Sequence, residues 1–311
     1  MTVGIVWDER YLAHAAQGHV ECPARLTALR QSLEGAGLWD RLVPIAARPA
    51  TDADLGRVHS PEHVERVRST AEAGGTVWFD ADTYACAASA RAAELAAGGV
   101  CAAVDAVMDG RAASAFCAVR PPGHHALRDR AMGFCLFNNV AVATRYVQAA
   151  RGIGRVLIVD WDVHHGNGTQ AIFYRDAQVL YVSTHQWPFY PGTGSGGETG
   201  EGPGRGQTLN YPLSHGAGDE EFLGAVDDAL EQAGDFGPEF VFISAGFDAH
   251  RDDPLGGLRL SDEAYAEATR RVWRLARETA GGRLVSVLDG GYNLDALGRA
   301  GVAHVGALME P

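Results

Sequence analysis

Lysine is absent from the sequence, so each of its 26 basic residues is an arginine, against 39 aspartates and glutamates. The formal net charge is therefore −13 at pH 7. A chain this acidic disfavours nucleic-acid binding, which needs a cationic surface, and favours cationic substrates. Because alanine, glycine and arginine are all used heavily, the missing lysine indicates genomic codon bias.

Cysteine is scarce as well, at five residues, an odd number without a Cys-x-x-Cys pair. This pattern indicates reduced thiols rather than a disulfide framework. The five are Cys22, Cys86, Cys101, Cys117 and Cys135.

Long apolar runs are also missing. No stretch suggests a transmembrane helix, and residues 1–10 lack the basic and apolar regions of a signal peptide, so we expect a cytoplasmic protein. There is no low-complexity linker and no repeat of about 20–50 residues. With 311 residues, of which 46% are hydrophobic, the chain suits one compact domain, residues 1–311, with a large core.

The segment from Val159 to Gly166 is the most informative one present, because acidic and imidazole groups alternate where an apolar run ends. If the chain is still extended there, Asp160, Asp162 and His164 share one side and could hold a single cation. Aspartate and histidine ligands without cysteine suit a catalytic divalent metal that keeps open positions for water. The alternative interpretation is a solvated strand end with a buried histidine.

Three other apolar stretches also end in polar residues and glycines. In an open parallel α/β sheet, ligands bind outside the carboxyl ends of the strands, so we expect all these loops to gather at one edge. One stretch would supply an acid/base pair of histidines, one a third metal ligand, and one a tyrosine hydroxyl. They are residues 115–119 before His124 and His125, 240–245 before Asp248, and 284–288 before Tyr292.

Strand and helix patterns alternate along the chain, which predicts an α/β protein with a parallel sheet. Strands are expected near 3–7, 115–119, 156–160, 179–183, 207–211, 240–245 and 284–288. Helices are expected near 85–109, 138–150, 219–233, 261–280 and 294–309.

Six ordered blocks resemble the histone deacetylase family, specifically its class II members and the bacterial histone-deacetylase-like and acetylpolyamine amidohydrolases. The resemblance covers nearly the whole chain. It implies a single-domain three-layer α/β/α fold of the arginase–deacetylase type, with a mostly parallel sheet of about eight strands. The blocks lie in residues 121–125, 133–138, 160–170, 191–194, 246–254 and 290–292.

The resemblance also implies a zinc-dependent deacetylase that hydrolyses N-acetyl- or N-acyl-lysine-like amides without a covalent intermediate. One catalytic zinc ion would be held by Asp162, His164 and Asp248, with other divalent metals possible. An amide is a poor electrophile and water a poor nucleophile, so the metal would polarise the carbonyl and lower the pKa of bound water.

The family's catalytic roles map onto five residues. His125 is the expected general base, and His124 with Asp160 behind it is the expected buried electrostatic partner. Tyr292 would donate a hydrogen bond to the developing oxyanion. Asn167 stands where class I members have an aspartate, and a neutral amide raises the basicity of the ring less than a carboxylate does, so we expect a pH profile at lower pH.

Five residues are candidates for substrate binding. Phe134 and Tyr190 resemble the aromatic walls that sandwich an acyl-lysine stem, and the carbonyl of Gly133 would help hold the substrate amide. Leu255 lies where polyamine-selective members carry a glutamate, which argues against polyamines. Asp82 would bind a substrate backbone at the rim, and the alternative is a solvated loop acid.

Structural potassium is the second cofactor that the resemblance implies. The inner site would use Asp160, Asp162, His164, Ser183 and Thr184. A further site would use the carbonyls of Phe173, Asp176 and Val179.

Three other functions stay open. The first is deacetylation of a small amine, such as an acetylated polyamine or a natural-product intermediate. The second is an arginase-like hydrolase with two manganese ions, which His124, His125 and Tyr292 disfavour. The third is an inactive module that binds acyl-lysine, which the complete set of catalytic residues disfavours. The physiological substrate, the oligomeric state and the choice between zinc and iron are not determined by the sequence.

Overall fold

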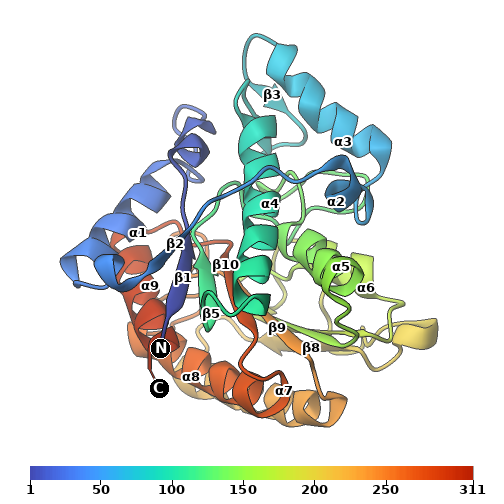
Figure 1. The fold of residues 1–311 in the computed structure, drawn as a ribbon, viewed down its shortest axis with the longest axis vertical. Coiled ribbons are helices and arrows are strands. Elements are labelled where there is room, and N and C mark those ends of the chain that lie inside the picture. The colour runs from blue at the N-terminus through green and yellow to red at the C-terminus, as the bar shows by residue number, and fades with distance from the viewer. Residues whose placement is uncertain (311) are drawn as a thin grey trace.

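Eight strands form one sheet in the order β2-β1-β5-β10-β9-β6-β7-β8, in a computed structural model that describes residues 1–310 (Figure 1). All neighbouring strands in this sheet are parallel. The predicted α/β class with a parallel sheet is therefore confirmed. The strands are β1 Val3–Val6, β2 Val43–Ile45, β5 Ser114–Cys117, β6 Val156–Asp160, β7 Val179–Gln186, β8 Thr208–Leu213, β9 Phe240–Ala245 and β10 Leu284–Leu288.

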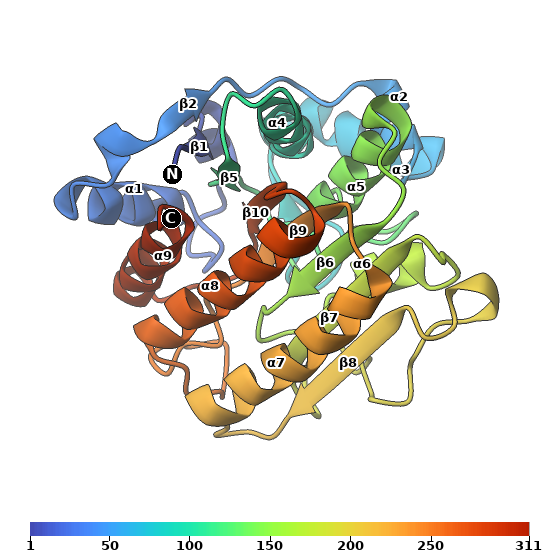
Figure 2. The same cartoon turned by 60° about the horizontal axis from the view of Figure 1, so that its bottom comes forward.

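Helices cover both faces of the sheet (Figure 2). One face carries α1, α7, α8 and α9, and the other carries α4 and α5, so the architecture has the predicted three layers. Because the central strands are buried on both faces, they are nearly continuous apolar runs. The helices are α1 Ala24–Gly35, α2 Asp52–Gly56, α3 Pro61–Arg68, α4 Ser89–Met108, α5 Asn139–Arg151, α6 Asn167–Phe173, α7 Asp219–Phe236, α8 Asp262–Thr279 and α9 Leu294–Leu308.

The strand order positions the candidate residues. β5 and β6 are successive strands of the main sheet along the chain, yet β10 and β9 lie between them in it. Such a reversal of strand order opens a crevice at the carboxyl edge of a parallel sheet. All four strands that precede the candidate catalytic residues are therefore neighbours at its centre.

Several short elements were not expected from the sequence. Besides β2, α1, α2, α3 and α6, these include the antiparallel pair β3 (Val77–Trp78) and β4 (Tyr84–Ala85). Figure 1 shows β3 and α3 together at the end of the molecule farthest from the two termini. The expected strand at 115–119 is found over Ser114–Cys117, so it ends two residues earlier, before the loop that contains Arg120 and Pro121.

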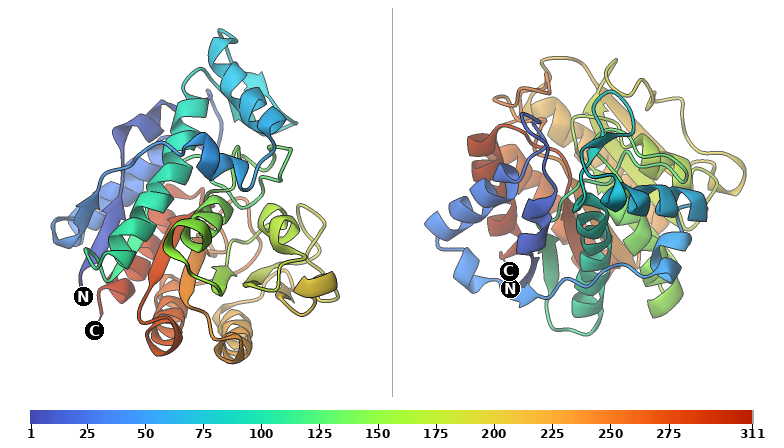
Figure 3. Two further views of the ribbon diagram at one scale, coloured as in Figure 1. Left: turned by 45° about the vertical axis from the view of Figure 1, so that its right-hand side comes forward. Right: turned by 90° about the horizontal axis from the view of Figure 1, so that it is seen from above.

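The two ends of the described chain lie side by side (Figure 3). The amino group of Met1 donates a hydrogen bond to the carbonyl oxygen of Met309 at 2.7 Å. Within residues 1–310, no helix has the length and apolar character needed to cross a bilayer. Cytoplasmic residence stays a prediction.

Candidate active site

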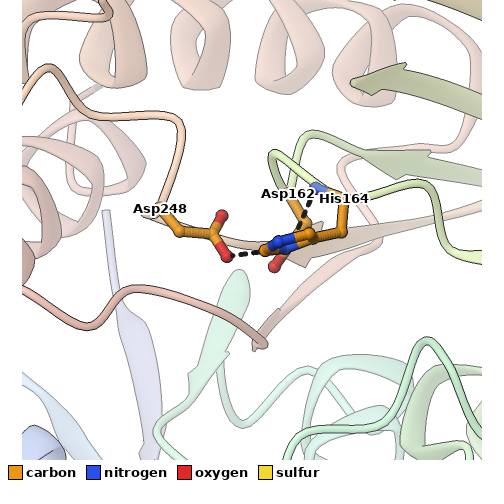
Figure 4. A group of neighbouring side chains, drawn as sticks. All are labelled: Asp162, His164 and Asp248. Atoms are coloured by element: carbon orange, nitrogen blue, oxygen red, sulfur yellow. Dashed lines mark hydrogen bonds and ion pairs between the residues drawn. The ribbon is translucent and has the colours of Figure 1, made fainter. Parts of the chain in front are cut away.

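Loops at the carboxyl edge of the sheet bring three side chains together (Figure 4). Asp162 and His164 come from the loop after β6, and Asp248 comes from the loop after β9. One potential ligand atom from each of these three residues lies within 4.8 Å of the other two. His164 Nδ1 is 3.1 Å from Asp162 Oδ1 and 3.3 Å from Asp248 Oδ2.

The electrostatics of this group call for a cation. Asp162 and Asp248 are fully buried, and the only donor near Asp248 Oδ2 among the described residues is the His164 ring, whose Nδ1 lies at ion-pair rather than good hydrogen-bonding geometry. Burial and the negative charge of Asp162 raise the pKa of Asp248 to about 7. Burial alone would lower the pKa of His164, but its hydrogen bonds to the two carboxylates raise it to about 9. A buried pair of carboxylates with one imidazole is stabilised when a positive charge lies between them.

Glycines leave space around the two carboxylates. A Cβ atom at Gly246 would overlap Asp162 Oδ2, and a Cβ atom at Gly290 would overlap Oδ2 of both Asp162 and Asp248. Two oxygen ligands and one nitrogen ligand, with room for a non-protein ligand, are the donor set of a catalytic metal rather than a closed structural one. The three residues therefore fit a divalent metal.

Asp160 lies outside this group, so the alternation that would unite it with Asp162 and His164 is not found. The reason is that β6 ends at Asp160 and the chain then turns. Oδ2 of Asp160 instead lies 3.1 Å from His124 Nδ1 and accepts a hydrogen bond from Tyr181 at 3.0 Å. Asp160 thus stands behind His124, as the family resemblance implies.

The two adjacent histidines have opposite environments. Burial disfavours the charged form of both rings, but the carboxylates of Asp162, Asp160 and Asp289 raise the pKa of His124 well above its usual value. Burial lowers the pKa of His125 well below its usual value, and the neighbouring His124 and His164 lower it further. One ring therefore holds a proton and the other stays neutral at neutral pH.

Asn167 fixes the tautomer of His125. Its Oδ1 lies 2.7 Å from His125 Nδ1, while its Nδ2 donates to the sulfur of Met132 at 3.4 Å. An amide oxygen can only accept, so Nδ1 of His125 carries the proton and Nε2 keeps a free lone pair.

Tyr292 follows the glycine pair at the end of β10. The N–H of Gly290 donates to Asp162 Oδ2 at 2.8 Å, and Arg25 Nε donates to the carbonyl of Gly291 at 2.6 Å. The Arg25 guanidinium also lies 4.9 Å from the centre of the Tyr292 ring. Burial raises the pKa of Tyr292 well above its usual value although Arg25 opposes this change, so its hydroxyl remains a hydrogen-bond donor.

A cavity of about 270 Å³ opens onto these groups. All five predicted substrate-binding residues line it, together with one residue that the sequence did not single out, Phe189. Its ring stacks on His164 with centroids 5.3 Å apart, and its position next to Tyr190 was the only available signal. The lining residues are Asp82, His125, Gly133, Phe134, His164, Phe189, Tyr190, Leu255 and Tyr292.

Thr83 links Phe134 and Asp82 at the mouth of this cavity. Phe134 has a left-handed backbone, with φ 67°, and its N–H donates to Thr83 Oγ1 at 3.1 Å, which in turn lies 3.4 Å from Asp82 Oδ1. The ring of Phe134 meets Tyr292 edge to face, with centroids 5.6 Å apart. Burial and the nearby Asp80 raise the pKa of Asp82. The cavity is thus apolar along its walls and carboxylate-bearing at the rim.

Of the residues expected at the inner potassium site, Asp162 and His164 belong to the triad, and the other three lie on the adjacent strands β6 and β7. Asp160 and Ser183 are paired on the adjacent strands β6 and β7. Ser183 Oγ lies 2.9 Å from His185 Nδ1, whereas the buried Oγ1 of Thr184 has no hydrogen-bond partner among the described residues. The carbonyl of Phe173 accepts the Asp176 N–H at 2.9 Å.

Comparisons with known proteins cover most or nearly all of the chain. The family model for a histone deacetylase domain matches residues 19–308. The chain is 44% identical to the histone deacetylase-like amidohydrolase of Pseudomonas aeruginosa, over 90% of this chain and 74% of that protein. It is 39% identical to the polyamine deacetylase HDAC10 of Mus musculus, over 98% of this chain and 46% of that protein.

A solved structure, the crystal structure of the HDA15 HD domain, matches with a TM-score of 0.94 and 44% identity. The match covers 99% of this chain and 89% of that one. Two relatives from Arabidopsis thaliana are longer proteins, of which this chain spans 57% and 49%.

Proposed function

The chain belongs to the histone deacetylase family, and from that premise we propose that it is a zinc-dependent amidohydrolase that removes acetyl or other acyl groups from lysine-like amines. The observation that carries this proposal is the cavity lining. One cavity exposes a triad ligand, a neutral histidine and a protonated tyrosine hydroxyl, namely His164, His125 and Tyr292. These are the three kinds of group that metal-assisted amide hydrolysis requires.

Zinc would be held by Asp162, His164 and Asp248, where it would polarise the amide carbonyl and lower the pKa of a bound water. The buried carboxylate of Asp248, whose Oδ2 has only the His164 ring beside it, and the space left by Gly246 and Gly290 support this assignment.

The chain's own residues handle the protons. Because Asn167 keeps Nδ1 of His125 protonated, the free Nε2 would take a proton from the attacking water. His125 would then pass that proton to the leaving amine. His124, paired with Asp160, would remain charged beside it. The Tyr292 hydroxyl would donate to the developing oxyanion, a contribution on the order of 3 kcal/mol where such donors have been removed from other enzymes.

An aliphatic stem with an acylated amine at its tip is the substrate shape that the cavity favours. Phe134, Phe189 and Tyr190 provide aromatic walls, and Leu255 adds an apolar side chain where a carboxylate would select a second cationic group. Asp82 at the rim would accept backbone N–H groups of a peptide. We therefore favour acyl-lysine in a peptide or protein; a chain without lysine cannot be its own substrate.

A small acetylated amine is the second candidate. The rim carboxylate Asp82 and the net charge of −13 would both attract a polycation. A polyamine deacetylase among the relatives is consistent with this alternative. An arginase-like site with two manganese ions is less well supported, because only one three-residue metal group is found in residues 1–310. An inactive acyl-lysine-binding module is less well supported because His125, His164 and Tyr292 all line the cavity.

Four further assignments are part of the proposal. They are potassium beneath the zinc, held through Asp160, Asp162, His164, Ser183 and Thr184; a second potassium on the carbonyls of Phe173, Asp176 and Val179; a single catalytic domain over residues 1–311; and cytoplasmic residence.

The test is hydrolysis by the zinc-loaded protein of an acetyl-lysine peptide beside N-acetylputrescine and N-acetylspermidine, with Tyr292→Phe as the comparison variant. Peptide turnover that falls about 100-fold in Tyr292→Phe supports the proposal. Turnover of the acetylpolyamines alone would move the assignment to the small-amine candidate. Activity that needs two manganese ions per chain would favour the arginase-like reaction.

A further inference from the structure

Asp253 is a buried carboxylate that neither joins the metal group nor lines the cavity. Only 7% of the residue is exposed. Its Oδ2 accepts the backbone N–H groups of Tyr292 at 2.6 Å and Asn293 at 3.0 Å, and its Oδ1 accepts the N–H of Leu255 at 3.0 Å. The hydrogen bonds to Tyr292 and Asn293 span 39 and 40 residues of sequence.

The partners of this carboxylate belong to the cavity. Tyr292 and Leu255 both line it, although they come from the loops after β10 and β9. A single side chain therefore joins the loop that carries the hydroxyl donor to the loop that carries Leu255, an apolar part of the wall of the same cavity. The carboxylate accepts three backbone N–H groups from two loops that are distant in sequence, so its geometry makes this connection a firm one.

The loop needs such a connection because two glycines, Gly290 and Gly291, precede Tyr292. Glycine allows many backbone conformations, and Gly291 adopts a φ of 118° that other residues rarely reach. Arg25 holds the loop from one side, through the Gly291 carbonyl and the Tyr292 ring. Asp253 holds the loop through the backbone N–H groups of Tyr292 and Asn293, directly before helix α9 begins at Leu294.

We propose that Asp253 is a positioning residue for amide hydrolysis: it fixes the Tyr292 hydroxyl where the oxyanion develops and fixes Leu255 in the wall of the cavity. This inference rests on the proposed role of Tyr292 as the oxyanion donor. The two contacts of this carboxylate should have different effects: the Tyr292 contact affects the chemical step, whereas the Leu255 contact affects substrate binding.

The experiment is a double-mutant cycle that combines Asp253→Asn with Tyr292→Phe. Asparagine keeps the size of the side chain but removes its charge and one of its two acceptor oxygens. The substrate is a trifluoroacetyl-lysine peptide, whose activated carbonyl keeps the slow variants measurable. Asp252→Asn is the matched control, because its carboxylate is half exposed and pairs with Arg299 at 2.9 Å, away from the cavity.

We expect Asp253→Asn to lower kcat by about 10- to 100-fold when Tyr292 is present, as a misplacement near 1 Å does in other enzymes. In the Tyr292→Phe background the same substitution should change kcat less than about threefold, because the hydroxyl that it displaces is already gone. KM should rise in both backgrounds, since the Leu255 contact is lost in both. Asp252→Asn should leave kcat and KM unchanged.

Zinc content and thermal unfolding of every variant show whether the fold and the metal are retained. If Asp253→Asn does not fold, Asp253→Glu replaces it, since it keeps the charge and moves the carboxylate by one methylene. Equal kcat losses in the two backgrounds would overturn the inference and make Asp253 a general structural residue. Full activity of Tyr292→Phe toward the acetyl-lysine peptide would overturn the oxyanion role in the proposed function, and with it this inference.

Discussion

Replacing Asn167 by aspartate places a negative charge behind the proposed general base while keeping the size of the side chain. Oδ1 of Asn167 lies 2.7 Å from Nδ1 of His125, so a carboxylate there would contact a protonated ring directly. Two unit charges about 4 Å apart interact with about 4 kcal/mol at an effective dielectric constant near 20. That energy would raise the pKa of His125 by about 3, and the cost of burying the new carboxylate reduces the expected rise to about 1–2.

The direction in which the pH profile should move follows from the role of His125 as a base. In the native protein the pKa of this ring is lowered well below its usual value by burial and by His124 and His164. Raising it keeps the ring protonated to a higher pH, so the acidic limb of the profile of kcat/KM against pH should move upward by about 1–2 pH units. At a fixed pH on that limb, kcat/KM falls about tenfold each time the pKa of the base rises by about 1.

The assay is peptide deacylation by the zinc-loaded protein across the pH range in which it stays folded. Gln31→Glu is the control, because it adds the same charge on an exposed position of helix α1 and should leave the profile unchanged. An acidic limb that stays in place, or that moves to lower pH, in Asn167→Asp would refute the assignment of His125 as the group whose protonation limits the reaction.

Three other substitutions test separate parts of the structure. Gly290→Ala would place a Cβ atom against the carboxylates of Asp162 and Asp248, so we expect the affinity for zinc to fall at least about tenfold. The zinc bound per chain is measured by atomic spectrometry. Gly224→Ala is the control, because the space around Gly224 is open, and it should bind zinc normally. Leu255→Glu should change the ratio of kcat/KM in favour of acetylspermidine over acetyl-lysine peptide by about tenfold, and an unchanged ratio would show that Leu255 does not govern selectivity. His304 is buried and neutral, with burial lowering its pKa to about 3. The unfolded chain therefore binds more protons below about pH 6.5, and the free energy of unfolding should fall by about 2 kcal/mol per such histidine between about pH 7.5 and 5. In chemical denaturation, the free energy of unfolding of His304→Gln should fall over this pH range by about 2 kcal/mol less than that of the native protein. An equal fall in the two proteins would mean that His304 does not titrate on unfolding.

The sequence predicted the part of the site that follows long apolar strands. Asp162, His164 and Asp248 come together because β6 and β9 are neighbours with parallel direction, and Tyr292 follows from β10 beside them. These strands are buried on both faces, so their apolar runs are strong signals. Their bounds were predicted to within a residue or two.

The remaining parts depend on contacts that local sequence does not encode. Asp253 looks like a turn aspartate before a proline, and its function becomes visible only when Tyr292, 39 residues later, is placed next to it. Arg25 on the unexpected helix α1 contacts the same loop across 266 residues of sequence. The strands β3 and β4 have two residues each, too few for an alternating pattern.

The order of the strands also sets the order in which the protein can assemble. β5 and β6 form the middle of the chain, but β9 and β10, made more than 70 residues later, must insert between them before the sheet is complete. A nascent chain that ends before Asp248 has two of the three metal ligands and a gap at the centre of its sheet. Pairings this distant in sequence close slowly, and a metal that needs all three ligands would bind late and stabilise only the finished sheet. The centre of the sheet therefore depends on the late part of the chain, and zinc would bind only after that part has joined it.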